Sequence, residues 1–202
     1  MVQPAEDAQW AAYALQKVNV FAFAGHGDGN SIEFVLFMYQ DPNIPYLVSH
    51  ISTEDGLSWF KDGDVNKYPI TSLSNLHLVV IGSCRLASIS GFPIVAAIVS
   101  KGAHCGIGVG GVGHKDYTVG KKYNDWNFLY STSYEKWSEI FWKITTAEGD
   151  AEAKDWAAKW PKMQEAAKRA MYRANMKLPK DQWVYVAFSG QDDYLGNIPG
   201  TF

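Results

Sequence analysis

Two apolar stretches, each followed at once by a polar loop, decide the fold of this chain. Residues 18–24 are VNVFAFA and lead into GHGDGN at residues 25–30, while residues 76–81 are LHLVVI and lead into GSCR at residues 82–85. A nearly continuous apolar run is typical of a strand that is covered on both faces, as in a parallel sheet. Both stretches therefore predict central strands of one sheet.

A histidine and a cysteine lie directly after these two predicted strands. His26 follows the first strand and Cys84 follows the second, 58 residues further along, which is enough chain for a connection that crosses over the sheet. In an open α/β sheet, functional groups collect beyond the carboxyl ends of the strands. If the two strands are adjacent and parallel, both side chains lie at one edge of the sheet.

The rest of the chain predicts further helices and strands. We expect residues 6–17 to form a helix with Trp10, Tyr13 and Ala14 on one face, and residues 57–60 to form a short helix. The other expected elements are a β-prone segment at 31–39, a helix at 92–101, a glycine-rich strand at 103–112, helices at 134–144, 147–160 and 161–176, and a strand at 183–188. This alternation predicts an α/β fold with a doubly wound, mostly parallel sheet flanked by helices.

Length and composition indicate one globular domain. The chain has 202 residues, of which 47% are hydrophobic and 19% charged. A domain of this size buries about 70% of the surface that its unfolded chain exposes. No repeat, low-complexity tract or linker divides the sequence, so we expect a single α/β domain over residues 1–202.

The charge pattern and the cysteines exclude several classes of protein. The formal net charge is −3 and no block of Lys or Arg occurs, which argues against nucleic acid or an acidic membrane as the main partner. No apolar run approaches the roughly 18 residues of a membrane span, and the N-terminal residues lack the pattern of a signal peptide. Two cysteines cannot build a disulfide framework, so we expect a reducing, cytoplasmic location.

The histidine and the cysteine together suggest nucleophilic catalysis. A thiol reacts as the thiolate, so a catalytic cysteine needs a nearby imidazole to take or share its proton. Gly27 follows His26 and leaves its backbone N–H uncovered by a side chain. Together with the N–H of Cys84, it could form an oxyanion hole for a tetrahedral acyl intermediate.

These two blocks resemble those of the caspase-like cysteine peptidases, a superfamily that includes caspases, legumain, clostripain, gingipains, separase and the CHAT domains. The blocks are FAFAGHG at residues 21–27 and VVIGSC at residues 79–84, and their order along the chain matches the superfamily. A helix that ends in Lys-Gly-Ala before a glycine-rich strand, and a later Trp-rich helix, are closest to the CHAT, gingipain and clostripain-like branches. The resemblance implies a caspase-like three-layer sandwich with His26 and Cys84 as a catalytic dyad.

The sequence also departs from the superfamily pattern. The caspase block Gln-Ala-Cys-Arg-Gly is not met, because GSCRL at residues 82–86 shares only Cys-Arg with it. This argues against a true caspase and its preference for aspartate. Only about one helix precedes the predicted His26 strand, where the superfamily usually has two strands and a pair of helices. An excised domain, a processed fragment and a minimal variant all remain open, as does membership of a larger assembly.

A substrate pocket is expected beside the segment from residue 110 to residue 126. Asp28, Asp116, Asp125 and Trp126 are candidates to line it, although solvated loop acids and a core tryptophan are the commoner interpretation. A buried carboxylate would select a basic residue before the scissile bond, because burying an unpaired charge is costly and a cationic substrate relieves that cost.

Three other signals are weaker. The sequence GVGGVG at residues 108–113 satisfies a dinucleotide-binding pattern, but no clear helix follows it. His104 and Cys105 are neighbours in a predicted strand and should point to opposite faces, and His77 begins another strand, so we expect no metal site. Cys105 is expected to be a buried thiol, although a Cys84–Cys105 disulfide is an alternative that would silence the nucleophile.

The sequence thus predicts a cysteine endopeptidase that cleaves polypeptides through a thioester acyl-enzyme and needs no cofactor. A non-catalytic caspase-like interaction or regulatory module is the main alternative, because few elements precede the His26 strand. A nucleotide-binding α/β protein is a third hypothesis.

Overall fold

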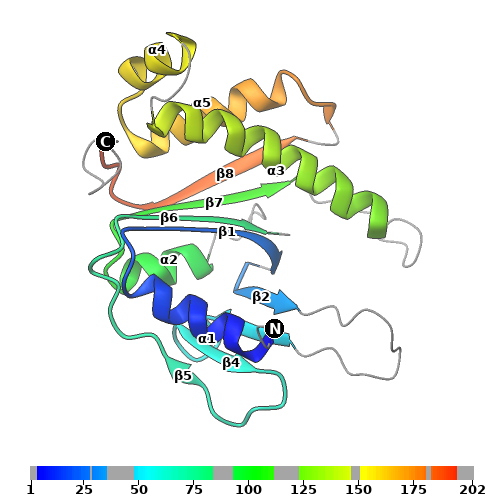
Figure 1. The fold of residues 1–202 in the computed structure, drawn as a ribbon, viewed down its shortest axis with the longest axis vertical. Coiled ribbons are helices and arrows are strands. Elements are labelled where there is room, and N and C mark those ends of the chain that lie inside the picture. The colour runs from blue at the N-terminus through cyan, green and yellow to red at the C-terminus, as the bar shows by residue number, and fades with distance from the viewer. Residues whose placement is uncertain are drawn as a thin grey trace.

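The computed structural model describes residues 4–27, 29–35, 48–83, 93–111, 123–146, 151–180 and 183–194. It is a mixed α/β fold (Figure 1). The helices are α1 (Pro4–Leu15), α2 (Pro93–Ser100), α3 (Tyr123–Thr146), α4 (Ala151–Lys159) and α5 (Met163–Asn175). The strands are β1 (Val20–Gly27), β2 (Ser31–Val35), β3 (Val48–Ser52), β4 (Ser58–Lys61), β5 (Tyr68–Pro69), β6 (Leu78–Ser83), β7 (Cys105–Gly111) and β8 (Val184–Gly190).

The central sheet has the order β1-β6-β7-β8 and is mostly parallel. β1 pairs with β6 in parallel, and β6 pairs with β7 in parallel. β8 is the edge strand of this sheet and runs antiparallel to β7, with Gly190 opposite Cys105. The two apolar runs that decide the fold are therefore neighbouring parallel strands, as the sequence predicts. The expectation that both are covered on both faces is confirmed for β6 and is wrong for β1, in which Ala22 and Ala24 are exposed.

β1 also belongs to a second, antiparallel sheet. Its residues Val20 to Gly25 pair with β6, whereas His26 and Gly27 pair with β2. From β2 the sheet continues through β3 and β4 to β5, each antiparallel to the one before. β1 thus belongs to the parallel sheet up to Gly25 and to the antiparallel sheet from His26 onward.

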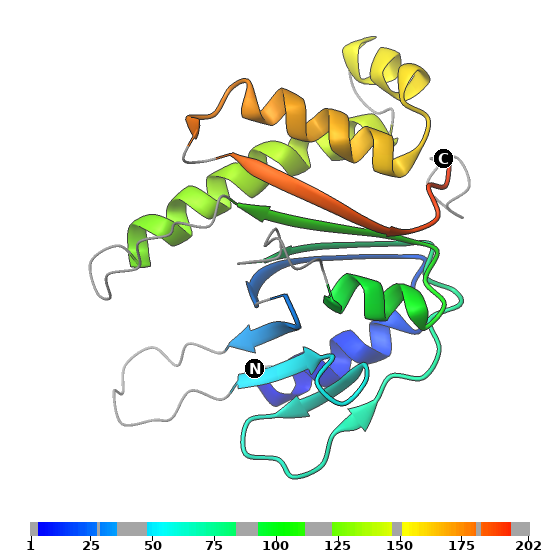
Figure 2. The ribbon, with the colours of Figure 1, turned by 180° about the vertical axis from the view of Figure 1, so that it is seen from behind.

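Helices pack on both sides of the central sheet. α3 and α5 pack against β7 and β8 on one side, with α4 beyond them, and α2 packs against the same two strands on the other (Figures 1 and 2). α1 lies on the same side as α2 but packs against β2, β3 and β4. The alternation of side chains along β6 separates two cores: Leu78 and Val80 belong to the core under α3 and α5, and Val79 and Ile81 to the core under α1 and α2. All six residues of β6 are buried, as a strand covered on both faces requires.

The core under α3 and α5 is built around Trp137. Its side chain is fully buried and its ring stacks on Phe141 at a centroid distance of 4.8 Å. The indole N–H donates a hydrogen bond of 3.1 Å to the carbonyl oxygen of Ala167 in α5, so this large ring is buried with its polar atom satisfied. Within the described parts of the chain, no helix has both the length and the apolar character that a membrane span needs.

The first helix buries a different face from the one expected. Trp10 and Tyr13 are 67% and 61% exposed, whereas Ala8, Ala12 and Leu15 are almost fully buried. α1 packs against β2, β3 and β4, and its small alanines allow the helix to lie close to those strands. The prediction that grouped the two aromatic residues with Ala14 was therefore wrong, because Ala14 belongs with the buried alanines.

The expected short helix at residues 57–60 is also wrong. Ser58–Lys61 is strand β4, which pairs with both β3 and β5. Trp59 stacks on Tyr68 across the β4–β5 pair with ring centroids 4.4 Å apart. A short apolar run fits helix and strand equally well, and here cross-strand contacts decide in favour of the strand.

The packing of α1 gives a direct test. Ala12→Leu should lower the free energy of unfolding by about 1–3 kcal/mol, because no space remains for the added atoms. Trp10→Ala, on the exposed face of the same helix, should change it by no more than about 0.5 kcal/mol. Urea denaturation followed by circular dichroism measures both. Equal effects of the two substitutions would contradict this packing of the helix.

Candidate functional site

The carboxyl ends of β1 and β6 meet at one edge of the central sheet. Their parallel register runs from Val20 opposite Leu78 to Gly25 opposite Ser83. His26 is the next residue of β1, and Cys84 follows Ser83 in the chain. The expectation that the two strands are adjacent, parallel and central is therefore confirmed. The side chain of His26 and the whole of Cys84 lie outside the described residues.

The ends of the two strands are in close contact. A Cβ atom placed on Gly27 would lie 3.0 Å from the hydroxyl oxygen of Ser83 and would overlap the carbonyl oxygen of Ser31. No side chain fits at position 27 without movement of the backbone. Gly27, which the sequence predicts as an oxyanion donor, thus lies directly beside the last residue of β6.

The α3 side of this edge is closed by Tyr134. A Cβ atom on Gly82 would overlap the ring of Tyr134, so the glycine allows the ring to lie close to the end of β6. Burial raises the pKa of the Tyr134 hydroxyl to about 12, so the side chain is neutral at physiological pH. Tyr134 therefore supplies an apolar, uncharged wall next to the residues that precede Cys84.

The antiparallel side of the edge carries polar residues. Glu33 in β2 is the cross-strand partner of His26, and His50 in β3 is the partner of Glu33. His50 forms an ion pair of 2.8 Å with Asp62 through its Nε2 atom, and its ring stacks on Phe60. Glu33 thus lies directly across from His26 in the register of the two strands. The sequence analysis did not identify Glu33, because it did not predict that β1 pairs with β2.

The expected pocket residues are only in part within the described structure. Asp28 and Asp116 lie outside the described residues. Asp125 and Trp126 belong to the first turn of α3, but their side chains lie outside the description. Their role in a pocket stays a prediction.

The second cysteine is remote from this edge. Cys105 is the first residue of β7, opposite Leu78, so it lies at the amino end of the parallel strands. It is a free, fully buried thiol, as expected, and it is not part of a disulfide with Cys84. Burial raises the pKa of its thiol to about 12, which keeps it protonated and unreactive.

The glycine pattern at residues 108–113 does not form a phosphate-binding turn in the part that is described. Gly108 to Gly111 lie within β7 and pair with β8. A dinucleotide site needs these glycines in the turn between a strand and a helix. The strand placement counts against the nucleotide-binding hypothesis.

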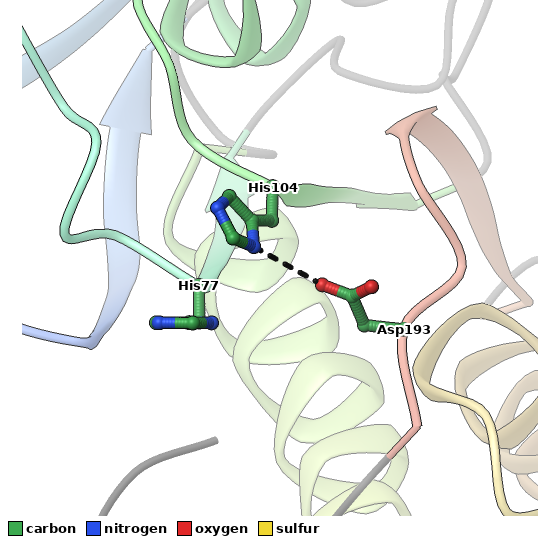
Figure 3. Close-up of side chains that lie close together, drawn as sticks. All are labelled: His77, His104 and Asp193. Atoms are coloured by element: carbon green, nitrogen blue, oxygen red, sulfur yellow. Dashed lines mark ion pairs between the residues drawn. The ribbon is translucent and has the colours of Figure 1, made fainter. Parts of the chain in front are cut away.

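A different group of side chains gathers at the amino end of the parallel strands. One ligand atom from each of His77, His104 and Asp193 lies within 4.8 Å of the others (Figure 3). The sequence argument against metal binding considered His104 together with Cys105. It missed that His77 directly precedes β6 and His104 directly precedes β7, so that both lie at the same edge of the sheet. The sequence around Asp193 does not indicate that the chain after β8 returns to that edge.

The chain was compared with models of known protein families, with curated proteins and with solved structures, and no match was found. The chemistry of the edge formed by β1 and β6 therefore rests on the geometry of this chain itself.

The close approach of Tyr134 to β6 can be tested by substitution. Gly82→Ala should destabilise the fold by about 1–3 kcal/mol, because its methyl group overlaps the Tyr134 ring. Removing the ring should relieve this overlap, so the double variant Gly82→Ala/Tyr134→Ala should be more stable than the sum of the single effects predicts. Strictly additive losses in urea denaturation would show that the ring does not rest on Gly82.

Proposed function

We propose that this chain is a caspase-like cysteine endopeptidase in which His26 and Cys84 form the catalytic dyad. The observation that carries the proposal is the parallel register of β1 and β6, which ends with Gly25 opposite Ser83. Each of the two chemically active residues follows one member of that last pair. Two adjacent, parallel strands are the simplest way for a fold to hold an imidazole and a thiol at one sheet edge.

In this mechanism the imidazole of His26 takes or shares the thiol proton, and the Cys84 thiolate attacks the carbonyl carbon of the scissile peptide bond. Backbone N–H groups of Gly27 and Cys84 stabilise the oxyanion that forms. The imidazolium then donates its proton to the leaving amine, which leaves a thioester acyl-enzyme. Water, activated by the same imidazole, hydrolyses the thioester and restores the thiol.

Glu33 is well placed to support the imidazole. It is the cross-strand partner of His26, and directly opposed residues of an antiparallel pair have Cβ atoms about 4.5–5.5 Å apart on the same face. A third group that orients the base is a recurring part of nucleophilic sites. We assign this positioning role to Glu33.

The arrangement of layers supports a caspase-like fold. Parallel strands β1, β6 and β7 form the centre of the sheet, with α3 and α5 packed on one side of it and α2 on the other. The proposed substrate is a polypeptide with a basic residue before the scissile bond, selected by an aspartate among Asp28, Asp116 and Asp125. A reducing, cytoplasmic setting would keep Cys84 as a thiol.

The proposal predicts that Cys84→Ala lowers the cleavage of fluorogenic peptide amides by at least about a thousandfold, because the nucleophile is lost. His26→Ala should cause a loss of similar size. Cys105→Ala is the matched control: it also removes a thiol, but one that is buried, protonated and remote, so activity should persist. Substrates with Arg, Lys, Asp or Leu before the cut test the preference for a basic residue in the same assay.

Alkylation of Cys84 by iodoacetamide distinguishes the peptidase from an interaction module. A thiol paired with imidazole should react with a midpoint well below the value of about 8.5 for a free cysteine, and His26→Ala should move that midpoint upward. Mass spectrometry can follow Cys84 while Cys105 remains unmodified. A midpoint near the free value, together with no cleavage of any peptide, would overturn the peptidase and favour a non-catalytic module.

A further inference from the structure

A second site is built at the amino end of the parallel strands, by residues that come from three separate parts of the chain. His77 directly precedes β6, His104 directly precedes β7, and Asp193 follows β8. Because β6 and β7 are parallel neighbours, the residues before them share one edge of the sheet. Because β8 is antiparallel to β7, with Gly190 opposite Cys105, its carboxyl end reaches that same edge.

The three side chains converge. The rings of His77 and His104 meet edge to face, with centroids 4.5 Å apart and an interplanar angle of 61°. Nδ1 of His104 lies 3.4 Å from a carboxylate oxygen of Asp193 (Figure 3). The Asp193 side chain is 18% exposed and that of His104 is 42% exposed, so the cluster is sheltered but can be reached from solvent.

Hydrogen bonds of the main chain fix all three residues. The N–H of His77 donates to Asn19 and its carbonyl oxygen accepts from Cys105, while the N–H of His104 donates to Leu76. The carbonyl oxygen of Asp193 accepts from Met163 at the start of α5. The cluster therefore belongs to a rigid part of the fold, in which side-chain torsions are the main remaining freedom.

Gly190 is the residue that lets the chain turn over His104. Its φ angle is +78°, a conformation that other residues rarely adopt, and a Cβ atom there would overlap the carbonyl oxygen of His104. The N–H of Gln191 then donates to that same oxygen at 2.8 Å. This turn carries the chain from the end of β8 to Asp193 beside the two histidines.

We propose that His77, His104 and Asp193 bind a divalent transition-metal ion, with Zn²⁺ as the ion best matched to them. Two imidazoles and one carboxylate form a donor set that suits zinc and its neighbours, whereas Mg²⁺ and Ca²⁺ prefer oxygen ligands alone. Bonds of about 2.0–2.2 Å place the ligand atoms of a tetrahedral zinc site about 3.3–3.6 Å apart. Nδ1 of His104 and the carboxylate oxygen of Asp193 already have this spacing. All three ligand atoms lie within 4.8 Å of one another, so rotation of the side chains has to bring them closer by no more than about 1.3 Å.

The metal would link β6, β7 and the segment after β8 at one point. β6 has six residues, so the site lies about 20 Å from the edge where Cys84 follows that strand. The ion would therefore stabilise the amino edge of the sheet and is separate from the proposed dyad. With three protein ligands, a coordination position is left for water or for a ligand from solution.

Zinc binding can be measured by competition with a fluorescent chelator, on protein without a histidine tag. The Cys84→Ala background removes the proposed nucleophile as a rival zinc ligand, so the outcome does not depend on the proposed peptidase activity. The chain should bind one Zn²⁺, and saturating Zn²⁺ should raise the midpoint of thermal unfolding by about 5 °C or more. An excess of Mg²⁺ or Ca²⁺ should not displace the ion.

Each of His77→Ala, His104→Ala and Asp193→Asn should weaken zinc binding at least about tenfold and remove the thermal shift. His50→Ala is the matched control, because His50 also pairs with an aspartate but has no third ligand among the described residues. Circular dichroism verifies that each variant is folded, and His104→Ala, at a partly exposed position, is the variant least prone to unfold. No zinc binding by the unchanged cluster, or equal binding by His104→Ala, Asp193→Asn and the control, would overturn the proposal.

Discussion

The parallel pairing of β1 with β6 is the contact on which the rest of the structure depends. It joins two strands that lie far apart in the sequence, from Val20 opposite Leu78 to Gly25 opposite Ser83. The side chains of β6 contribute to both cores, so a shift of the register by one residue would exchange the sets that face the two helix layers. The burial of apolar surface on both faces therefore fixes the register, and the register fixes which residues follow the strands at the sheet edge.

The same sheet brings together different residues at its two edges. At the carboxyl edge, β1 turns from β6 to β2 just after Gly25, so that His26 adjoins both the end of the parallel sheet and the first pair of the antiparallel one. At the amino edge, the return of β8 adds Asp193 to the histidines that precede β6 and β7. The order of the strands thus brings residues from distant parts of the sequence to the same edge of the sheet.

The sequence predicted those parts of the fold in which local pattern and tertiary packing agree. The apolar run of β6, the glycine-rich strand β7 and the helices α2 and α5 are buried in the way that their local pattern indicates. The apolar run of β1 was expected to be covered on both faces, but Ala22 and Ala24 are exposed in it. The face of α1 was missed because aromatic residues were grouped together, whereas the helix buries its alanines and leaves Trp10 and Tyr13 in solvent. β4 was missed because four residues are too few to show a period, and its stability comes from pairing with β3 and β5. The His77–His104–Asp193 cluster depends on strand order, which no local pattern contains.

The central claim is that positions 26 and 84 are neighbours across the β1–β6 pair, and disulfide trapping tests it most directly. Neighbouring strands lie about 4.8 Å apart, within the Cα separation of about 4.4–6.8 Å that a disulfide allows. In a Cys105→Ala background, His26→Cys should form a disulfide with Cys84 under mild oxidation, detected by mass spectrometry of the linked peptides. His50→Cys is the matched control, since His50 lies in the same cross-strand row through Glu33 but two strands further away, beyond the reach of a disulfide. Rapid cross-linking of position 26 but not of position 50 is the predicted result, whereas no cross-link at position 26, or equal cross-linking at both, would contradict the account.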